Sequence, residues 1–319
     1  MSIRSVTARL HGSDVLIIVF LLFLTAVTLV FRVPHWWLMA LINCAVIAGI
    51  CLLAWARQAT GSRLLAAVHD WHVAPTVFFT FKELYYIIRP LHGGRDYDVL
   101  LIAADRWLFG VDPTRWLAQF STPWVTEILQ IAYTLFYLLF VAVGWELYRR
   151  GRTYEFHVFM FTCVYGFFLS YLGYFLLPAV GPRFTLHDFA AMDRDLPGVF
   201  LTPYLRWFVN FGGSVPMGVP NAEAIALTQR DVFPSGHTMM TLVVIALSFR
   251  FRIRLRYAVL VVGVLLIVAT VYERYHYVVD LLGGAAFMLL CILTAGRLFR
   301  ACTTSLGTLE SRFPPPPGA

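Results

Sequence analysis

The sequence predicts an all-α protein, a polytopic membrane bundle of about eight transmembrane helices. Of its 319 residues, 59% are hydrophobic and only 13% are charged, whereas about a quarter of an average soluble protein is charged. Several largely apolar stretches also approach or reach the roughly 20 residues that a spanning helix needs. These stretches are Val15–Phe31, Trp37–Trp55, Trp124–Trp145, Val158–Leu177, Tyr257–Tyr272 and Tyr277–Ala295.

Arginine clusters between the apolar stretches predict the orientation of the chain. They occur at Arg57/Arg63, Arg149/Arg150/Arg152, Arg250/Arg252/Arg254/Arg256 and Arg297/Arg300. The positive-inside rule assigns all of them to the cytoplasmic side. With the N-terminus inside, the predicted spans are 14–31, 37–56, 74–90, 124–147, 157–177, 235–249, 257–273 and 276–296. The third carries Lys82 and Glu83, and the sixth is short for a bilayer.

Two longer segments lie between the spans. Residues 91–123 lack a long apolar run, and Asp98, Asp105 and Asp112 recur there every seven residues. This spacing predicts an amphipathic interfacial helix that ends near Gly110, although a solvated surface face would give the same pattern. Residues 178–234 are rich in Gly, Pro and Asp and form the main external loop of the prediction.

The composition also argues against other classes of protein. The net charge of +7 comes mostly from loop arginines, so it indicates membrane orientation and no nucleic-acid partner. The five cysteines lack the paired spacing of a zinc site or a disulfide framework, and we expect no metal and no cofactor. Seven histidines have no motif around them and are interpreted as interfacial or loop residues: His11, His35, His69, His72, His92, His157 and His187.

The predicted topology brings six ionisable residues to the outer membrane face from distant parts of the sequence. They are Lys82, Arg89, Arg183, His237, His276 and Asp280. Ionisable residues near membrane depth are costly and are candidates for function. Lys82 and Arg89 stand two helical turns apart before Pro90, and together they suit a phosphate group. For each residue alone, snorkelling at a helix end is the simpler explanation.

The two histidines of this set each have a local context. Ser235, as N-cap of a helix that begins at Gly236, would leave free amides for an anion, and His237 in the first turn can protonate a leaving oxygen. A plain capped helix is the alternative. His276 and Asp280 are spaced i, i+4, so the carboxylate can hold one ring nitrogen and leave the other as a nucleophile. A purely structural hydrogen bond explains that pair equally well.

Taken together, three motifs resemble those of the type 2 phosphatidic-acid phosphatase superfamily, which includes the vanadium haloperoxidases. The motifs are Lys82-x6-Arg89-Pro90, Pro234-Ser235-Gly236-His237 and His276-x3-Asp280. The resemblance implies that His276 is the nucleophile that forms a phosphohistidine, that Asp280 orients it, and that His237 is the general acid. It also implies a metal-independent enzyme with a phosphate site made by Lys82, Arg89, Ser235 and the Gly236 amide.

One position departs from the superfamily pattern. The superfamily usually has an arginine six residues before the nucleophilic histidine, where this chain has Thr270. We expect Arg183, in Gly181-Pro182-Arg183, to replace it as a phosphate ligand. Arg274 is the second candidate, although on a regular helix it would face away from His276.

Further segments resemble the inositol-phosphorylceramide synthase branch of the superfamily. They are Leu108-Phe109-Gly110-Val111-Asp112-Pro113, Gly181-Pro182-Arg183 and Arg274-Tyr275-His276-Tyr277. The resemblance implies transfer of a phosphorylated, inositol-type headgroup between lipids. Hydrolysis of a lipid phosphate is the alternative, and a non-catalytic lipid transporter is a further one.

The expected domain organisation and location follow from these motifs. Residues 1–73 form two additional transmembrane helices, 74–297 a six-helix catalytic core, and 298–319 a disordered cytoplasmic tail. We expect a plasma-membrane protein with its active site on the extracytoplasmic face.

Overall fold

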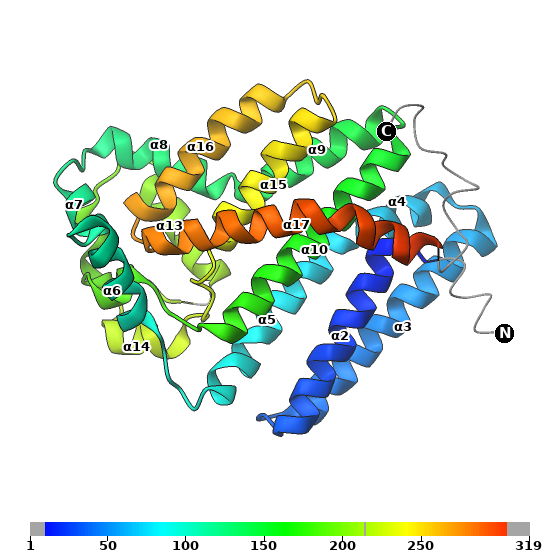
Figure 1. Cartoon of the computed structure of the whole chain (residues 1–319), viewed down its shortest axis with the longest axis horizontal. Coiled ribbons are helices and arrows are strands. Elements are labelled where there is room, and N and C mark those ends of the chain that lie inside the picture. Colours follow the sequence, from blue (N-terminus) through cyan, green and yellow to red (C-terminus); the bar gives the residue numbers. More distant parts are fainter. Residues whose placement is uncertain (1–9, 214, 305–319) are drawn as a thin grey trace. The chain divides into compact units, whose positions relative to one another are not determined.

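The computed structural model describes residues 10–213 and 215–304, and every regular element within them is helical. The longer helices are α2 (Gly12–Phe31), α3 (Trp36–Thr60), α4 (Arg63–Trp71), α5 (Val73–Leu91), α6 (Asp98–Phe109), α8 (Pro123–Thr134), α9 (Phe136–Arg149), α10 (Thr153–Leu176), α13 (Thr202–Gly212), α15 (Gly236–Arg250), α16 (Arg256–Tyr272) and α17 (Val278–Thr304). The shorter ones are α7 (Pro113–Ala118), α11 (Pro182–Thr185), η1 (Phe189–Ala191), α12 (Met192–Asp195) and α14 (Asn221–Leu227) (Figure 1). The predicted all-α class is confirmed.

Helices occur at all eight predicted spans, but they do not all qualify as spans by length and apolar composition. Four do, namely α2, α3, α10 and α17, and α8 with α9 would make a fifth if this pair, bent by 49°, is one span. The apolar helices α15 and α16 are shorter, and α5 carries Lys82, Glu83 and Arg89. The chain is therefore a helical membrane protein.

The chain forms two compact units. One contains Met1–Leu91, Glu146–Phe168 and Leu290–Ala319, and the other contains His92–Trp145 and Leu169–Leu289. The sequence was expected to divide at residues 73 and 297 instead, into added helices, core and tail. That division stays a prediction, since the units describe packing. Of the expected tail, residues up to Thr304 continue α17, and 305–319 lie outside the described residues.

In the first unit α2 packs against α3 and α5 (Figure 1). A buried histidine–aspartate network lies where these helices meet α4 and α10; its members are His11, Asp14, Arg57, His69, Asp70, His72 and His157. His69 Nε2 lies 3.0 Å from Asp14 Oδ2, and both side chains are fully buried. The interpretation of these histidines as interfacial or loop residues was therefore wrong for His69 and His157, which lie within α4 and α10 and are buried. His11 and His72 do lie at helix ends, and their rings join the same network.

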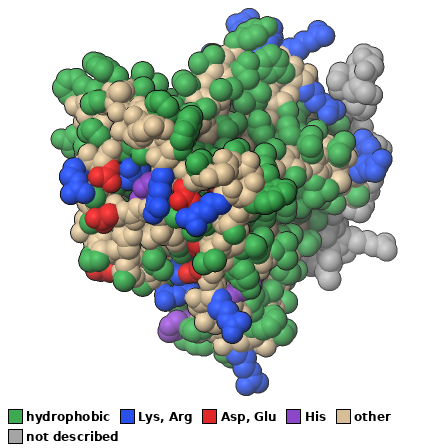
Figure 2. All heavy atoms as spheres, turned by 60° about the vertical axis from the view of Figure 1, so that its left-hand side comes forward, with side chains coloured by type: hydrophobic (Ala, Val, Ile, Leu, Met, Phe, Trp, Pro, Cys, Tyr) green, Lys and Arg blue, Asp and Glu red, His purple; other side chains and the backbone are tan. Residues whose placement is uncertain are grey.

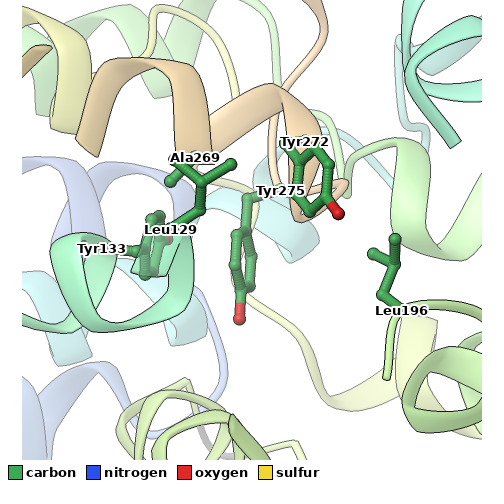
Figure 3. Close-up of a cluster of buried hydrophobic side chains, with 6 residues drawn as sticks. All are labelled: Leu129, Tyr133, Leu196, Ala269, Tyr272 and Tyr275. Carbon is green, nitrogen blue, oxygen red and sulfur yellow. The ribbon is translucent and has the colours of Figure 1, made fainter. Parts of the chain in front are cut away.

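The second unit is built around α15, α16 and α8. Helix α16 packs against both of the others, and α15 comes so close that a Cβ at Gly263 would lie 2.9 Å from Thr241 Cγ2. One hydrophobic cluster joins α8 and α16 to the segments that follow α12 and α16 (Figure 3). It contains Leu129, Tyr133, Leu196, Ala269, Tyr272 and Tyr275. This core fixes the end of α16, from which the chain turns into the His276 segment.

Candidate active site

Helix α15 begins as the sequence predicts. Ser235 is its N-cap and accepts a hydrogen bond from the Thr238 amide at 3.2 Å. A Cβ at Gly236 would overlap the Tyr174 hydroxyl, so only glycine fits there. Helix α17 packs closely against this helix start. The Ser235 amide donates to the Asp280 carbonyl at 2.9 Å, and a Cβ at Gly284 would lie 2.7 Å from the Ser235 carbonyl oxygen. The first turns of α15 and α17 therefore lie together.

His276 lies just before α17, in the segment after α16, and not on one helix face with Asp280 as the i, i+4 spacing suggested. Its Nδ1 lies 3.0 Å from the Val232 carbonyl oxygen and 3.4 Å from Asp280 Oδ2. A carbonyl only accepts, so Nδ1 carries the proton and the lone pair of a neutral imidazole is on Nε2. Asp280 Oδ2 also accepts from the Tyr277 amide at 2.8 Å, which holds the turn beside the histidine.

The rings of His237 and His276 lie side by side, with centroids 5.7 Å apart. His237 is enclosed by aromatic rings: it stacks on Tyr133 at 4.7 Å and lies 4.5 Å from Phe136. Tyr133 in turn stacks on Tyr275 at 4.2 Å, and Figure 3 shows both rings next to Ala269. These rings exclude water from one side of the histidine pair.

Arg183 is held close to the same rings. Gly181 has a φ of +101°, which favours glycine, and a Cβ there would lie 2.9 Å from the Tyr275 carbonyl oxygen. The Arg183 amide donates to the Arg274 carbonyl at 3.0 Å. Its guanidinium lies 4.9 Å from the Tyr275 ring centroid and donates to Asn210 Oδ1 at 2.8 Å. Arg183 therefore belongs to the group of side chains around the two histidines.

Thr270, which stands where the superfamily has an arginine, and Arg274, the second candidate to replace that arginine, both have structural roles. Thr270 is fully buried, and its carbonyl accepts the amides of Tyr275 and His276 at 2.9 Å each. Arg274 has a left-handed backbone, with φ +64°, and its guanidinium bonds to Asp195 Oδ2 at 3.2 Å. The turn at Arg274 takes the chain out of α16, which a regular helix would not do.

Two aspartates on α6 hold the site in place, a role that the sequence analysis did not predict for them. Asp98 accepts from the Val180 amide at 3.0 Å, and from the Gly181 amide and the Tyr277 hydroxyl at 2.8 Å each. Asp105 accepts from the amides of Val278 and Val279, at 2.9 and 2.8 Å, and so caps α17.

The alternative of a solvated surface face was therefore wrong for these two residues. Both are buried, and burial raises the pKa of Asp98 and of Asp105, while the bound N–H groups act in the opposite direction. Their seven-residue spacing was the available signal, since it puts both on one face of a helix that does end at Gly110. Only Asp112 behaves as a surface residue would, in ion pairs with Arg106 and Arg115.

The structure thus brings together Arg183, Ser235, Gly236, His237, His276 and Asp280 within the second unit. The other two predicted phosphate ligands lie on α5 in the first unit, where Lys82 is half-buried and Arg89 is exposed.

Among the described residues, groups of three His, Asp, Glu or Cys side chains close enough to hold a metal ion occur only in the first unit. His11, Asp14 and His69 bring one ligand-type atom each within 4.8 Å of one another, and so do His11, Asp70 and His157. However, Arg57 Nη1 lies 2.8 Å from His11 Nε2 and 3.1 Å from His69 Nδ1. Arginine only donates, so it already supplies the cation of this network.

Two comparisons with known proteins found a match. A family model described as the PAP2 superfamily matches residues 99–294, which include both histidines, Asp280 and Arg183 but not α5. A PA-phosphatase related-family protein of Dictyostelium discoideum is 24% identical over 242 residues, or 64% of this chain. The aligned part is 41% of that relative's length, so the chain spans less than half of it. No solved structure matches the chain.

Proposed function

Since the chain belongs to the PAP2 superfamily, we propose that it is a membrane enzyme that transfers a phosphorylated, inositol-type headgroup between lipids through a phosphohistidine. The observation that carries the proposal is the hydrogen bond from His276 Nδ1 to the Val232 carbonyl. This bond fixes the tautomer in which Nε2 is nucleophilic, in a segment that Thr270, Asp280 and Asp105 hold from three sides.

The reaction proceeds in two displacements at phosphorus. In the first, His276 Nε2 forms a bond to phosphorus, the bond to the lipid oxygen breaks, and His237 gives that oxygen its proton. In the second, an acceptor hydroxyl attacks phosphorus, the P–N bond breaks, and the hydroxyl proton passes to His237. Both residues are then as they were at the start. A lipid alcohol as acceptor gives transfer, and water gives hydrolysis.

The phosphate oxygens need donors that remain in place during both steps. Arg183, the Ser235 hydroxyl and the Gly236 amide supply them beside the histidines, with the helix N-termini adding their dipoles. The resemblance to the superfamily motifs also assigns Lys82 and Arg89, on α5, to phosphate binding. The inositol-type headgroup and the lipid acceptor rest on the resemblance of the Gly181–Arg183 and Arg274–Tyr277 segments to the synthase branch.

The proposed orientation places the site on the extracytoplasmic face of the plasma membrane. The arginine clusters at the opposite helix ends support it through the positive-inside rule.

The test compares wild type, His276→Asn and the control His92→Asn in detergent with EDTA. His92 is a suitable control because its ring bonds to the Phe175 carbonyl at 2.8 Å, outside the histidine pair. Two substrates separate the reactions: phosphatidic acid reports phosphate release, and phosphatidylinositol with a lipid alcohol reports headgroup transfer. Acid-labile phosphate on the protein is measured after rapid quenching.

We expect turnover in EDTA by wild type and His92→Asn, no turnover by His276→Asn, and the labile phosphate only where His276 is present. Transfer without phosphate release supports the synthase assignment, and phosphate release alone would replace it with a hydrolase. Equal turnover in His276→Asn would refute the phosphohistidine. Lipid binding without turnover in every protein would favour a transporter.

A further inference from the structure

Helix α13 has its polar side inside the protein and its aromatic side outside. Thr202, Arg206 and Asn210, one helical turn apart from each other, are each at most 2% exposed. On the other side Tyr204, Trp207, Phe208 and Phe211 are between 55% and 73% exposed. This pattern is the reverse of a surface helix in a soluble protein, where the apolar stripe faces the core.

The buried side of α13 is bonded to the segments that form the active site. Arg206 is fully buried and donates to Glu273 Oε2 at 2.8 Å, three residues before His276. Asn210 accepts from Arg183 Nη1 at 2.8 Å. A second bond from Arg206, to Asp193 at 2.8 Å, reaches α12. The orientation of α13 is therefore fixed, and its aromatic side cannot turn inward.

The start of α13 is attached to α8 by a single carboxylate. Glu127 accepts from the amides of Val199, Leu201 and Thr202 at 2.6 to 3.2 Å, and from the Thr202 hydroxyl at 2.7 Å. Helix α8 belongs to the bent apolar pair that would make a fifth span if the two helices are one, and it exposes Trp124 at 66%. The start of α13 is thus attached to an apolar helix that also exposes a large aromatic side chain.

We propose that α13 lies in the interface of the bilayer, with its aromatic side among the lipid headgroups and upper acyl chains and its polar side holding Arg183 and Glu273. An 11-residue helix is about 16 Å long at 1.5 Å per residue, too short for a hydrocarbon core of about 30 Å. It therefore lies along the membrane surface. Tryptophan and tyrosine favour this zone because their rings are apolar and their N–H and O–H groups stay wet.

The exposed side of α13 carries no charged residue. Figure 2 brings forward the left-hand side of Figure 1, and hydrophobic side chains cover much of the face that it shows. Arg206 is the only charged residue in α13, and it points inward. A lipid interface accounts for the exposed rings without any further protein.

Spin labels measure the depth of α13 directly. Trp207→Cys and Phe211→Cys are labelled in a protein whose Cys44, Cys51 and Cys302 are replaced by serine, and reconstituted in phosphatidylcholine vesicles. Arg194→Cys, on the neighbouring α12 with a side chain 80% exposed, is the matched control. We expect the two α13 labels to collide more with oxygen, which concentrates in lipid, than with a water-soluble nickel chelate. The control should show the reverse.

Water-like accessibility at both α13 positions would overturn the proposal. So would spin–spin broadening that disappears on dilution with unlabelled protein, because it would assign the aromatic side to a second copy. A kinetic arm rests on the proposed function: Trp207→Ser with Phe211→Ser should slow turnover of long-chain lipid in vesicles by about tenfold and leave a soluble short-chain analogue unaffected. If wild type turns over neither substrate, only the proposed function fails, since the spin-label result needs no activity.

Discussion

Asp98→Asn should disturb the active site from a residue that touches neither histidine. The carboxylate of Asp98 accepts three hydrogen bonds, from the Val180 and Gly181 amides and the Tyr277 hydroxyl. All three partners donate, so an amide in this position keeps one acceptor oxygen and turns an NH2 group toward a donor. The substitution is close to isosteric and leaves no cavity.

The size of the effect follows from the bonds lost. A hydrogen bond to a charged group contributes about 1.5–3 kcal/mol, and an unmatched buried donor adds its own penalty. Burial raises the pKa of Asp98. Desolvation of the carboxylate therefore offsets part of what each hydrogen bond contributes, and we use the lower end of the range of about 1.5–3 kcal/mol. Asp98 Oδ1 accepts from both Gly181 and Tyr277, so an amide oxygen in its place keeps two bonds and only the Val180 bond is lost. That bond, together with the penalty for the unmatched Val180 amide, gives about 3 kcal/mol, or a decrease in Tm of about 6–12 °C for a chain of this size.

The assay is thermal unfolding in detergent together with turnover of a lipid phosphate. Asp98→Asn should lower Tm by this amount and slow turnover, because Gly181 and Tyr277 flank Arg183 and His276. Tyr277→Phe removes one of the three bonds and should have a smaller effect in the same direction. Asp112→Asn, on an exposed ion pair with Arg106, is the control and should change Tm little. Equal Tm and turnover for Asp98→Asn and Asp112→Asn would show that the bonds to Asp98 do not hold the site.

Three further substitutions test other parts of the structure. Gly236→Ala should abolish turnover because its Cβ overlaps the Tyr174 hydroxyl, and Tyr174→Phe should restore part of it, since the ring carbon Cζ lies 3.7 Å away; no recovery would contradict the steric explanation. Arg57→Gln removes the guanidinium of the histidine–aspartate network, so it should lower the free energy of unfolding by about 2–4 kcal/mol without changing turnover. An unchanged Tm would show that the network does not depend on this guanidinium. Burial, with the charges of Arg274 and Arg115, lowers the pKa of His187 to about 4. Because the unfolded chain then binds a proton more readily than the folded one, the stability of the protein should fall as the pH drops from about 6.5 to 4. In His187→Gln, Tm should fall less over the same pH range.

Much of the local structure could be predicted because it depends on neighbouring residues. The apolar stretches became helices, α6 ends at Gly110, and Ser235 caps α15. Each of these follows from a short run of sequence, through helix length, a glycine that adopts a left-handed conformation, or a side chain that meets an amide three residues on.

The positions that could not be predicted depend on contacts between distant segments. The spacing of His276 and Asp280 suggested one helix face, but the turn at Arg274 takes His276 off the helix and brings its Nδ1 to Val232, 44 residues away. Asp98 bonds to a hydroxyl 179 residues away. A periodic pattern shows which residues share a face, but it does not show what that face meets.

Hydropathy and motifs were enough to identify a helical membrane protein and the residue types available for phosphate chemistry. Hydrophobic length and motif spacing are properties of the chain, and they hold before any tertiary contact forms. Three other features appear only in the folded chain: the lone pair of His276 is on Nε2, two buried aspartates hold the site, and α13 turns its aromatic side outward. Each depends on which buried donor meets which acceptor, and folding makes that choice because an unpaired polar group inside the protein is too costly.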